Sequence, residues 1–175
     1  MDMRHYMDLI ETAKALQGDL IDALEQWEND YSKDDTWQQS SRSAANESRI
    51  IALSANHHPA YNGMLYRGTG ISDADYHVLE HGGDVTFRQS DSKKLVSWTK
   101  DMSVAKSFAE DAVDSGFSSV VIAMHSSRLQ MLVDIDEVLG MPTGESEVIV
   151  LSRPIELNAS NVVEMLKYDD DNQKH

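Results

Sequence analysis

One stretch near the C-terminal end of the chain constrains the fold more than any other. In Gly144–Leu151, Glu145 and Glu147 are followed at once by a run of branched apolar residues, and Pro154 lies just beyond. This run predicts a buried strand of about five residues that begins at Glu147. Because residues two apart in an extended chain point to the same side, the two carboxylates should project together from the mouth of the strand. For an isolated Glu-x-Glu pair, the simpler explanation is that both side chains are exposed to solvent where the strand begins. Residues elsewhere in the chain must decide whether the pair has a function.

The composition limits the function classes that the chain can belong to. Its 175 residues, enough for one domain with a proper core, include 15 Lys and Arg against 30 Asp and Glu, which gives a formal net charge of -15. So acidic a surface argues against DNA or membrane binding and favours a basic protein partner. The absence of Cys excludes disulfides, thiolate catalysis and cysteine metal sites. No signal peptide and no apolar run of about 20 residues is present, which predicts a soluble, cytoplasmic protein.

The pattern of apolar residues divides the chain into three parts. Residues 1–60 are predicted to form a helical extension, because apolar positions recur every three or four residues over 6–30 and a second helix is expected from about Trp37 to Leu53. Residues 61–168 contain many short strands and two helices, which predicts an α+β core with largely antiparallel sheets. Residues 169–175 form a polar tail.

Within the core, the helices have recognisable starts and ends. Asp73 is expected to cap a short helix that runs through Leu79 and ends at Gly82-Gly83, and Asp101 or Ser103 should start a second helix. The predicted strands lie at residues 64–68, 85–87, 95–99, 119–124, 131–135, 147–151 and 162–166.

Three short sequence elements with polar residues lie at the ends of predicted strands, and their order along the chain is informative. They are Leu65–Gly68 with Arg67, Val96–Thr99 with Ser97, and Glu145–Val150. A helix with Ala105, Phe108 and Ala109 follows the second element. This combination resembles the R-S-E class of mono-ADP-ribosyltransferases, which includes bacterial toxins and enzymes of tailed phages. The resemblance covers roughly residues 61–168 and leaves the N-terminal helices outside it.

The resemblance implies a fold, a substrate and an acceptor. The fold would be two roughly perpendicular antiparallel sheets that enclose an NAD cleft, with the N-terminal helices packed alongside. NAD would be a substrate, no metal would be required, and the Glu-x-Glu form implies arginine on a host protein as acceptor, in the host cytoplasm if the chain is of phage origin. Two departures concern the middle element, which is Ser-Trp-Thr instead of Ser-Thr-Ser, and the loop before Glu145, which has no aromatic residue. Trp98 should point away from Ser97 and Thr99, so two hydroxyls remain on the active face.

The chemistry of NAD cleavage suits these residue types. Nicotinamide leaves as a neutral group, so no general acid is needed, but the ribosyl cation left behind requires electrostatic stabilisation, as in glycoside hydrolysis. Glu147 is the candidate for that role, and Ser97 would orient it. Arg67 would hold the pyrophosphate or ribose through its fork of donors, which matters in so acidic a protein.

The remaining site residues have narrower predicted roles. Gly68 would let the backbone approach the carboxamide of NAD, Thr99 would line the cofactor site, and Phe108 would either contact the nicotinamide or belong to the helix core. Glu145 would align the acceptor guanidinium and take its proton.

Two interpretations from other classes stay open. His77-Val78-Leu79-Glu80-His81 matches the H-x-x-E-H pattern of zinc metallopeptidases, although the predicted helix is short and no third ligand follows. Alternatively, the acidic surface and the N-terminal helices would suit a non-enzymatic inhibitor that mimics nucleic acid and binds a basic host protein. Titration with NAD separates this inhibitor from the transferase.

Overall fold

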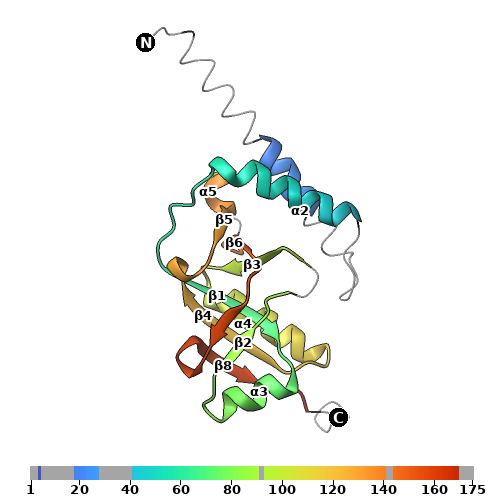
Figure 1. Ribbon diagram of the computed structural model, residues 1–175, viewed down its shortest axis with the longest axis vertical. Helices are drawn as coiled ribbons and strands as arrows, with labels where there is room; N and C mark the ends of the chain where they lie inside the picture. Colours follow the sequence, from blue (N-terminus) through green and yellow to red (C-terminus); the bar gives the residue numbers. More distant parts are fainter. Residues whose placement is uncertain (1–3, 5–17, 28–40, 91–92, 141–143, 170–175) are drawn as a thin grey trace.

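The structure is a computed structural model that describes residues 4, 18–27, 41–90, 93–140 and 144–169 (Figure 1). Its strands are β1 (Met64–Gly70), β2 (Val85–Phe87), β3 (Leu95–Thr99), β4 (Ser119–His125), β5 (Met131–Asp134), β6 (Glu147–Leu151), β7 (Ile155–Leu157) and β8 (Val162–Leu166). Its helices are α2 (Ser41–Leu53), α3 (Asp73–Glu80), α4 (Met102–Asp114) and α5 (Ile135–Leu139), with 3₁₀ turns η1 (Ser54–Asn56), η2 (Ser126–Arg128) and η3 (Ala159–Asn161). Residues 18–27 are also helical.

The described strands form two antiparallel sheets, so the predicted α+β class is confirmed. A six-stranded sheet has the order β5-β6-β3-β1-β4-β8, and β2 and β7 form a small second sheet. The strands β1 and β3 are neighbours in the same sheet. These two strands share the register pair Tyr66↔Thr99, whereas β1 pairs with β4 along its whole length from Met64 to Gly70. The large sheet therefore consists of two three-stranded halves joined at a narrow contact.

Alternating side chains of the large sheet pack into different clusters on its two faces. On one face, Trp98 and Val148 belong to a cluster that includes residues of α3, β2 and β7. On the other face, Leu95 and Ile149 pack against the helix of residues 18–27 and against α2. Because side chains alternate along a strand, Ser97 and Glu147 lie on this second, helix-facing side.

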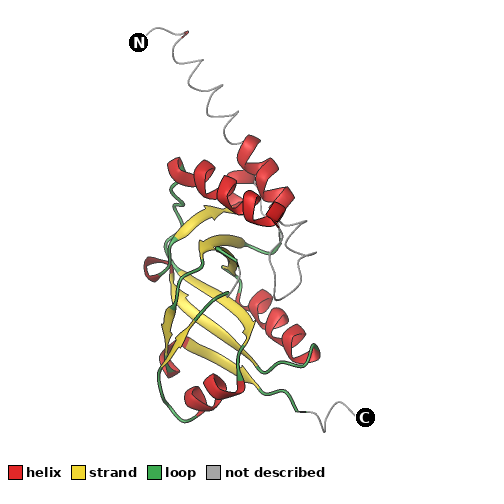
Figure 2. Cartoon of the chain, turned by 45° about the vertical axis from the view of Figure 1, so that its right-hand side comes forward, coloured by secondary structure: helices red, strands yellow, loops and turns green. Residues whose placement is uncertain are grey.

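Helix α4 covers the β1-β4-β8 half of the helix-facing side (Figure 2). It begins after Asp101, whose carboxylate accepts the Ser103 N–H at 2.9 Å, so the predicted start is confirmed. The hydroxyl and N–H of Ser103 lower the pKa of Asp101. A Cβ atom on Gly68 would lie 1.8 Å from the carbonyl oxygen of Ala105, so only glycine at this position lets α4 pack so closely on β1.

Some predicted boundaries need correction. Ser72, not Asp73, is the N-cap of α3, because the Ser72 hydroxyl accepts the Asp75 N–H at 3.2 Å. The strand β7 was not predicted. The predicted helical residues within 6–17 and 28–40, including Trp37, and residues 170–175 of the tail lie outside the described part of the chain. In the part that is described, no helix has both the length and the apolar character needed to cross a membrane.

Candidate functional site

A pocket of about 380 Å³ lies on the helix-facing side, where the two halves of the large sheet meet. Strands β1, β3 and β6 contribute to its wall, together with α4 and Trp27 of the N-terminal helix. Every residue that the sequence predicts for the site lines this one pocket: Arg67, Gly68, Ser97, Thr99, Phe108, Glu145 and Glu147. The structure thus gathers three elements that are far apart in the chain, while the roles assigned to them remain predictions.

A hydrogen bond joins Ser97 and Glu147 in the centre of the site. The strands pair with Thr99 opposite Glu147 and Ser97 opposite Ile149, so Ser97 and Glu147 are diagonal neighbours on one face. The Ser97 hydroxyl donates to Glu147 Oε2 at 2.5 Å. Hydrogen bonds to a carboxylate are among the stronger ones in proteins, so this contact fixes the orientation of a half-buried carboxylate.

Arg67 contacts the same serine from the other half of the sheet. Its Nη1 atom donates to the Ser97 carbonyl oxygen at 2.7 Å. The guanidinium is half-buried and lines the pocket, so a fixed cation and a fixed carboxylate are both attached to one residue of β3.

The turn that carries Glu145 departs from the predicted geometry. Ser146 has φ 50°, in the left-handed region, and Gly144 has φ 91°. The prediction of an extended backbone from Glu145 to Glu147 is therefore wrong, because the chain turns at Ser146 between the two carboxylates. Both residues still line the pocket, with Glu145 exposed and Glu147 half-buried.

Thr99 holds this turn against the end of β3. Its hydroxyl donates to the Glu145 carbonyl oxygen at 2.7 Å and accepts the Asp101 N–H at 3.0 Å. The Lys100 N–H donates to the Ser146 carbonyl oxygen at 3.0 Å. A hydroxyl has one proton, and Thr99 donates its proton within the protein. Thr99 would therefore line the pocket beside a ligand without donating a hydrogen bond to it.

Aromatic side chains form two sides of the pocket. Phe108 of α4 is 51% exposed, so it belongs to the pocket and not to the helix core. Trp27 is 2% exposed and packs in the cluster under the N-terminal helices. Sequence reasoning missed Trp27, because its helical spacing indicates a buried face but not what that face meets.

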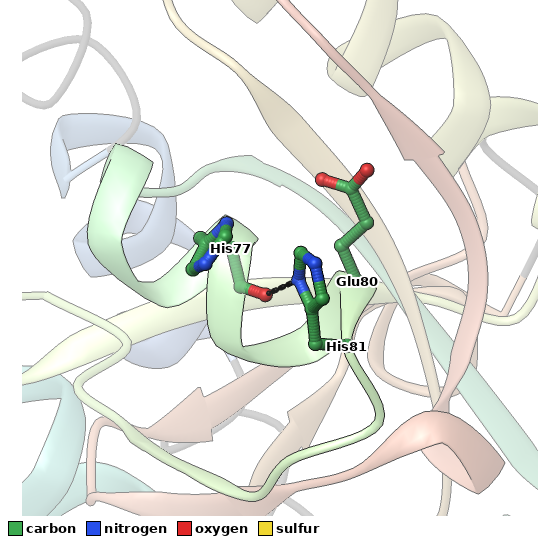
Figure 3. Close-up of side chains that lie close together, drawn as sticks. All are labelled: His77, Glu80 and His81. Atoms are coloured by element: carbon green, nitrogen blue, oxygen red, sulfur yellow. Dashed lines mark hydrogen bonds between the residues drawn. The ribbon is translucent and has the colours of Figure 1, made fainter.

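The other predicted cluster lies elsewhere. His77 and Glu80 of α3 and its C-cap residue His81 are exposed, and none of them lines this pocket. Figure 3 shows how these three side chains lie.

Comparison of the chain with protein-family models and with curated proteins gives no match.

Proposed function

We propose that this protein is a mono-ADP-ribosyltransferase that cleaves the nicotinamide–ribose bond of NAD and transfers ADP-ribose to an arginine of a basic host protein. The observation that carries the proposal is the contact of Ser97 with both Arg67 and Glu147 inside one pocket, at 2.7 Å and 2.5 Å. The same three residues were selected from the sequence by their resemblance to the R-S-E class. The resemblance was based on the order of these residues in the sequence. Their contacts in one pocket therefore support it with a separate kind of evidence.

The proposed chemistry assigns the carboxylate to the ribosyl cation. As the bond to nicotinamide breaks, its electron pair leaves with the ring nitrogen, and positive charge develops on the anomeric carbon and ring oxygen of the ribose. A carboxylate that is already oriented stabilises this charge without reorganising at that moment. The Ser97 hydrogen bond supplies this orientation for Glu147.

The pocket suits one end of a dinucleotide. Its volume of about 380 Å³ falls within the range of about 300–1,000 Å³ that is usual for ligand sites. Arg67 supplies a cation for the phosphates or the ribose, and Phe108 offers an exposed apolar face for the nicotinamide ring. In a chain of net charge -15, such a cation offsets the repulsion of an anionic substrate.

We assign Glu145 to the acceptor. It is exposed at the edge of the pocket, whereas Glu147 is half-buried, so a protein docking from outside meets Glu145 first. Its carboxylate would align the guanidinium and remove the proton that nitrogen loses when it attacks the ribosyl carbon. We place this reaction in the cytoplasm, with a basic protein as partner and no role for a membrane.

The test is the substitution Glu147→Gln, followed by measurement of nicotinamide release from NAD. We expect a loss of about 10²–10³-fold, the usual effect of removing one preorganised electrostatic partner. Glu164→Gln, an exposed glutamate on β8, is the matched control and should keep full activity. A Glu147→Gln variant within about tenfold of the wild-type rate would refute the assignment. Failure of the wild-type protein to bind NAD would refute the function itself and favour the acidic inhibitor.

A further inference from the structure

The outer face of α3 holds three potential metal ligands that the proposed reaction does not use. His77 and Glu80 lie in the last turn of α3, and His81 is its C-cap residue, so the three stand at positions i, i+3 and i+4 and share one face. One ligand atom from each residue lies within 4.8 Å of the other two, and the two imidazole rings are 4.1 Å apart between centroids (Figure 3). All three side chains are exposed.

A hydrogen bond orients the His81 ring through one of its two nitrogen atoms. His81 Nδ1 lies 2.8 Å from the carbonyl oxygen of His77, as the dashed line in Figure 3 shows. A carbonyl oxygen only accepts, so Nδ1 carries the proton and the Nε2 atom of the neutral ring keeps its lone pair. Metal-binding histidines usually have this arrangement, in which one ring nitrogen donates to a carbonyl and the other faces the metal.

The backbone around the cluster is held in place. Leu79 is 5% exposed and anchors the inner face of α3 in the large core cluster. After the last turn of the helix, the N–H groups of Gly82 and Gly83 donate to the carbonyl oxygens of Leu79 and Val78 at 3.1 Å and 2.8 Å. The backbone of the ligand-bearing turn is therefore held by contacts on its other side.

We propose that His77, Glu80 and His81 bind one divalent transition-metal ion, with Zn²⁺ as the expected ion, at a site separate from the proposed transferase pocket. Bonds of about 2.0–2.2 Å in tetrahedral geometry place ligand atoms about 3.4 Å apart. The present separation of at most 4.8 Å thus needs to shrink by about 1.4 Å. Two imidazoles and one carboxylate suit Zn²⁺, Co²⁺ or Ni²⁺ and not Mg²⁺ or Ca²⁺, which prefer oxygen ligands. Water would complete the coordination.

The experiment uses the untagged full-length chain after dialysis against a chelator. Zn²⁺ binding is measured by calorimetry and Co²⁺ binding by visible absorption, with Mg²⁺ as a negative control. We expect the wild-type protein to bind one equivalent of Zn²⁺ and of Co²⁺. His77→Ala and His81→Ala should each weaken this binding at least tenfold, since even loss of a residue that supports a ligand costs about 10–100-fold.

His58→Ala is the matched control, because His58 is exposed but lies between η1 and β1 and not in the proposed site. This variant should bind as the wild type does. Urea unfolding without metal checks that the His77→Ala and His81→Ala variants are folded. Zn²⁺ should raise the melting temperature of the wild type and of His58→Ala, but not that of the other two variants. The absence of saturable Zn²⁺ binding by the wild type, or equal binding by the His77→Ala and wild-type proteins, would overturn the proposal. Neither result bears on NAD cleavage, which is measured separately.

Discussion

Ser97 has a double role that follows from its position at the join of the two half-sheets. Its backbone carbonyl oxygen accepts from Arg67, and its side-chain hydroxyl donates to Glu147. One residue therefore positions both charged groups of the proposed site. Only the hydroxyl depends on the side chain, so the backbone alone maintains the contact with Arg67.

The first prediction concerns Arg67. Arg67→Ala should weaken the binding of NAD by about 10–100-fold, because a hydrogen bond to a charged group contributes about 1.5–3 kcal/mol. Arg67→Lys should restore only part of this affinity, since a point charge does not replace a planar fork of donors. Calorimetric titration with NAD measures both variants, and Arg128→Ala, an exposed arginine on η2, is the control. Unchanged affinity in Arg67→Ala would rule out its role in holding NAD.

The second prediction separates the two glutamates. Glu145→Gln should keep much of the NAD hydrolysis but lose arginine modification by about 10²–10⁴-fold, the usual effect of removing a general base. The physical reason is that Glu147 and its Ser97 hydrogen bond stay in place, so water can still capture the ribosyl carbon. Nicotinamide release and agmatine modification are measured in parallel. If both rates fall by the same factor, Glu145 belongs to the NAD-cleaving machinery and the division of roles is wrong.

At the scale of elements, the sequence predicts the strands that carry the site better than the turns between them. The predicted bounds of β2, β3, β6 and β8 match the structure, because each is a short stretch rich in apolar and β-branched residues between polar residues. The left-handed backbone of Ser146 could not be predicted, since a non-glycine residue pays about 1–2 kcal/mol there and local sequence gives no reason for it. Its cause lies in tertiary contacts with Thr99 and Lys100 at the end of β3.

Gly68 shows how the packing of two elements shapes the candidate site. Close approach of this glycine to a ligand stays a prediction, and the structure shows that Gly68 also approaches the α4 backbone closely. Gly68→Ala should therefore push α4, which carries Phe108, away from β1. We expect a loss of stability of about 1–3 kcal/mol, as for other overpacked sites, together with reduced NAD turnover.

Gly70→Ala tests whether that effect is specific. It is the same change on the same strand, but its Cβ would meet the Phe117 Cβ atom at an ordinary 3.4 Å. Urea unfolding and nicotinamide release of both variants give the comparison. Equal stability of the Gly68→Ala and Gly70→Ala proteins would contradict the close packing of α4 on β1.

At the scale of the whole molecule, the N-terminal helices are joined to the core that carries the site. Trp27 lines the pocket, and Leu24 and Ile50 pack on the sheet residues Leu95 and Ile149. These contacts make the helices part of the same packed body as the sheet. A domain boundary at residue 60 remains a prediction. The sequence could not show these contacts, since an amphipathic helix has a buried face whatever it covers.

A buried carboxylate attaches α2 to the strand that carries Ser97. Glu47 is fully buried, and its Oε2 atom accepts the N–H of Leu95 at 2.7 Å. Burial raises the pKa of this carboxyl, although the N–H groups of Leu95 and Lys94 and the charges of Lys93 and Lys94 act to lower it. The folded protein therefore holds the Glu47 proton more tightly than the unfolded chain does. The resulting stability is fully present below the ordinary pKa of 4.5 and is lost as the pH rises through the raised pKa.

The last prediction follows from the raised pKa of Glu47. Glu47→Gln keeps an oxygen that can accept the Leu95 N–H but removes the buried charge. The free energy of unfolding of the variant, relative to wild type, should therefore rise between about pH 4 and pH 7, by about 1.4 kcal/mol for each unit by which the pKa is raised. Urea denaturation at both pH values measures this difference, and Glu164→Gln on the exposed side of β8 is the control that should show no such trend. Other carboxylates titrate equally in all three proteins, so they cancel in the comparison. A difference between Glu47→Gln and wild type that does not change with pH would mean that this carboxyl has the same pKa in the folded and unfolded protein, and that its burial does not disfavour the charged form.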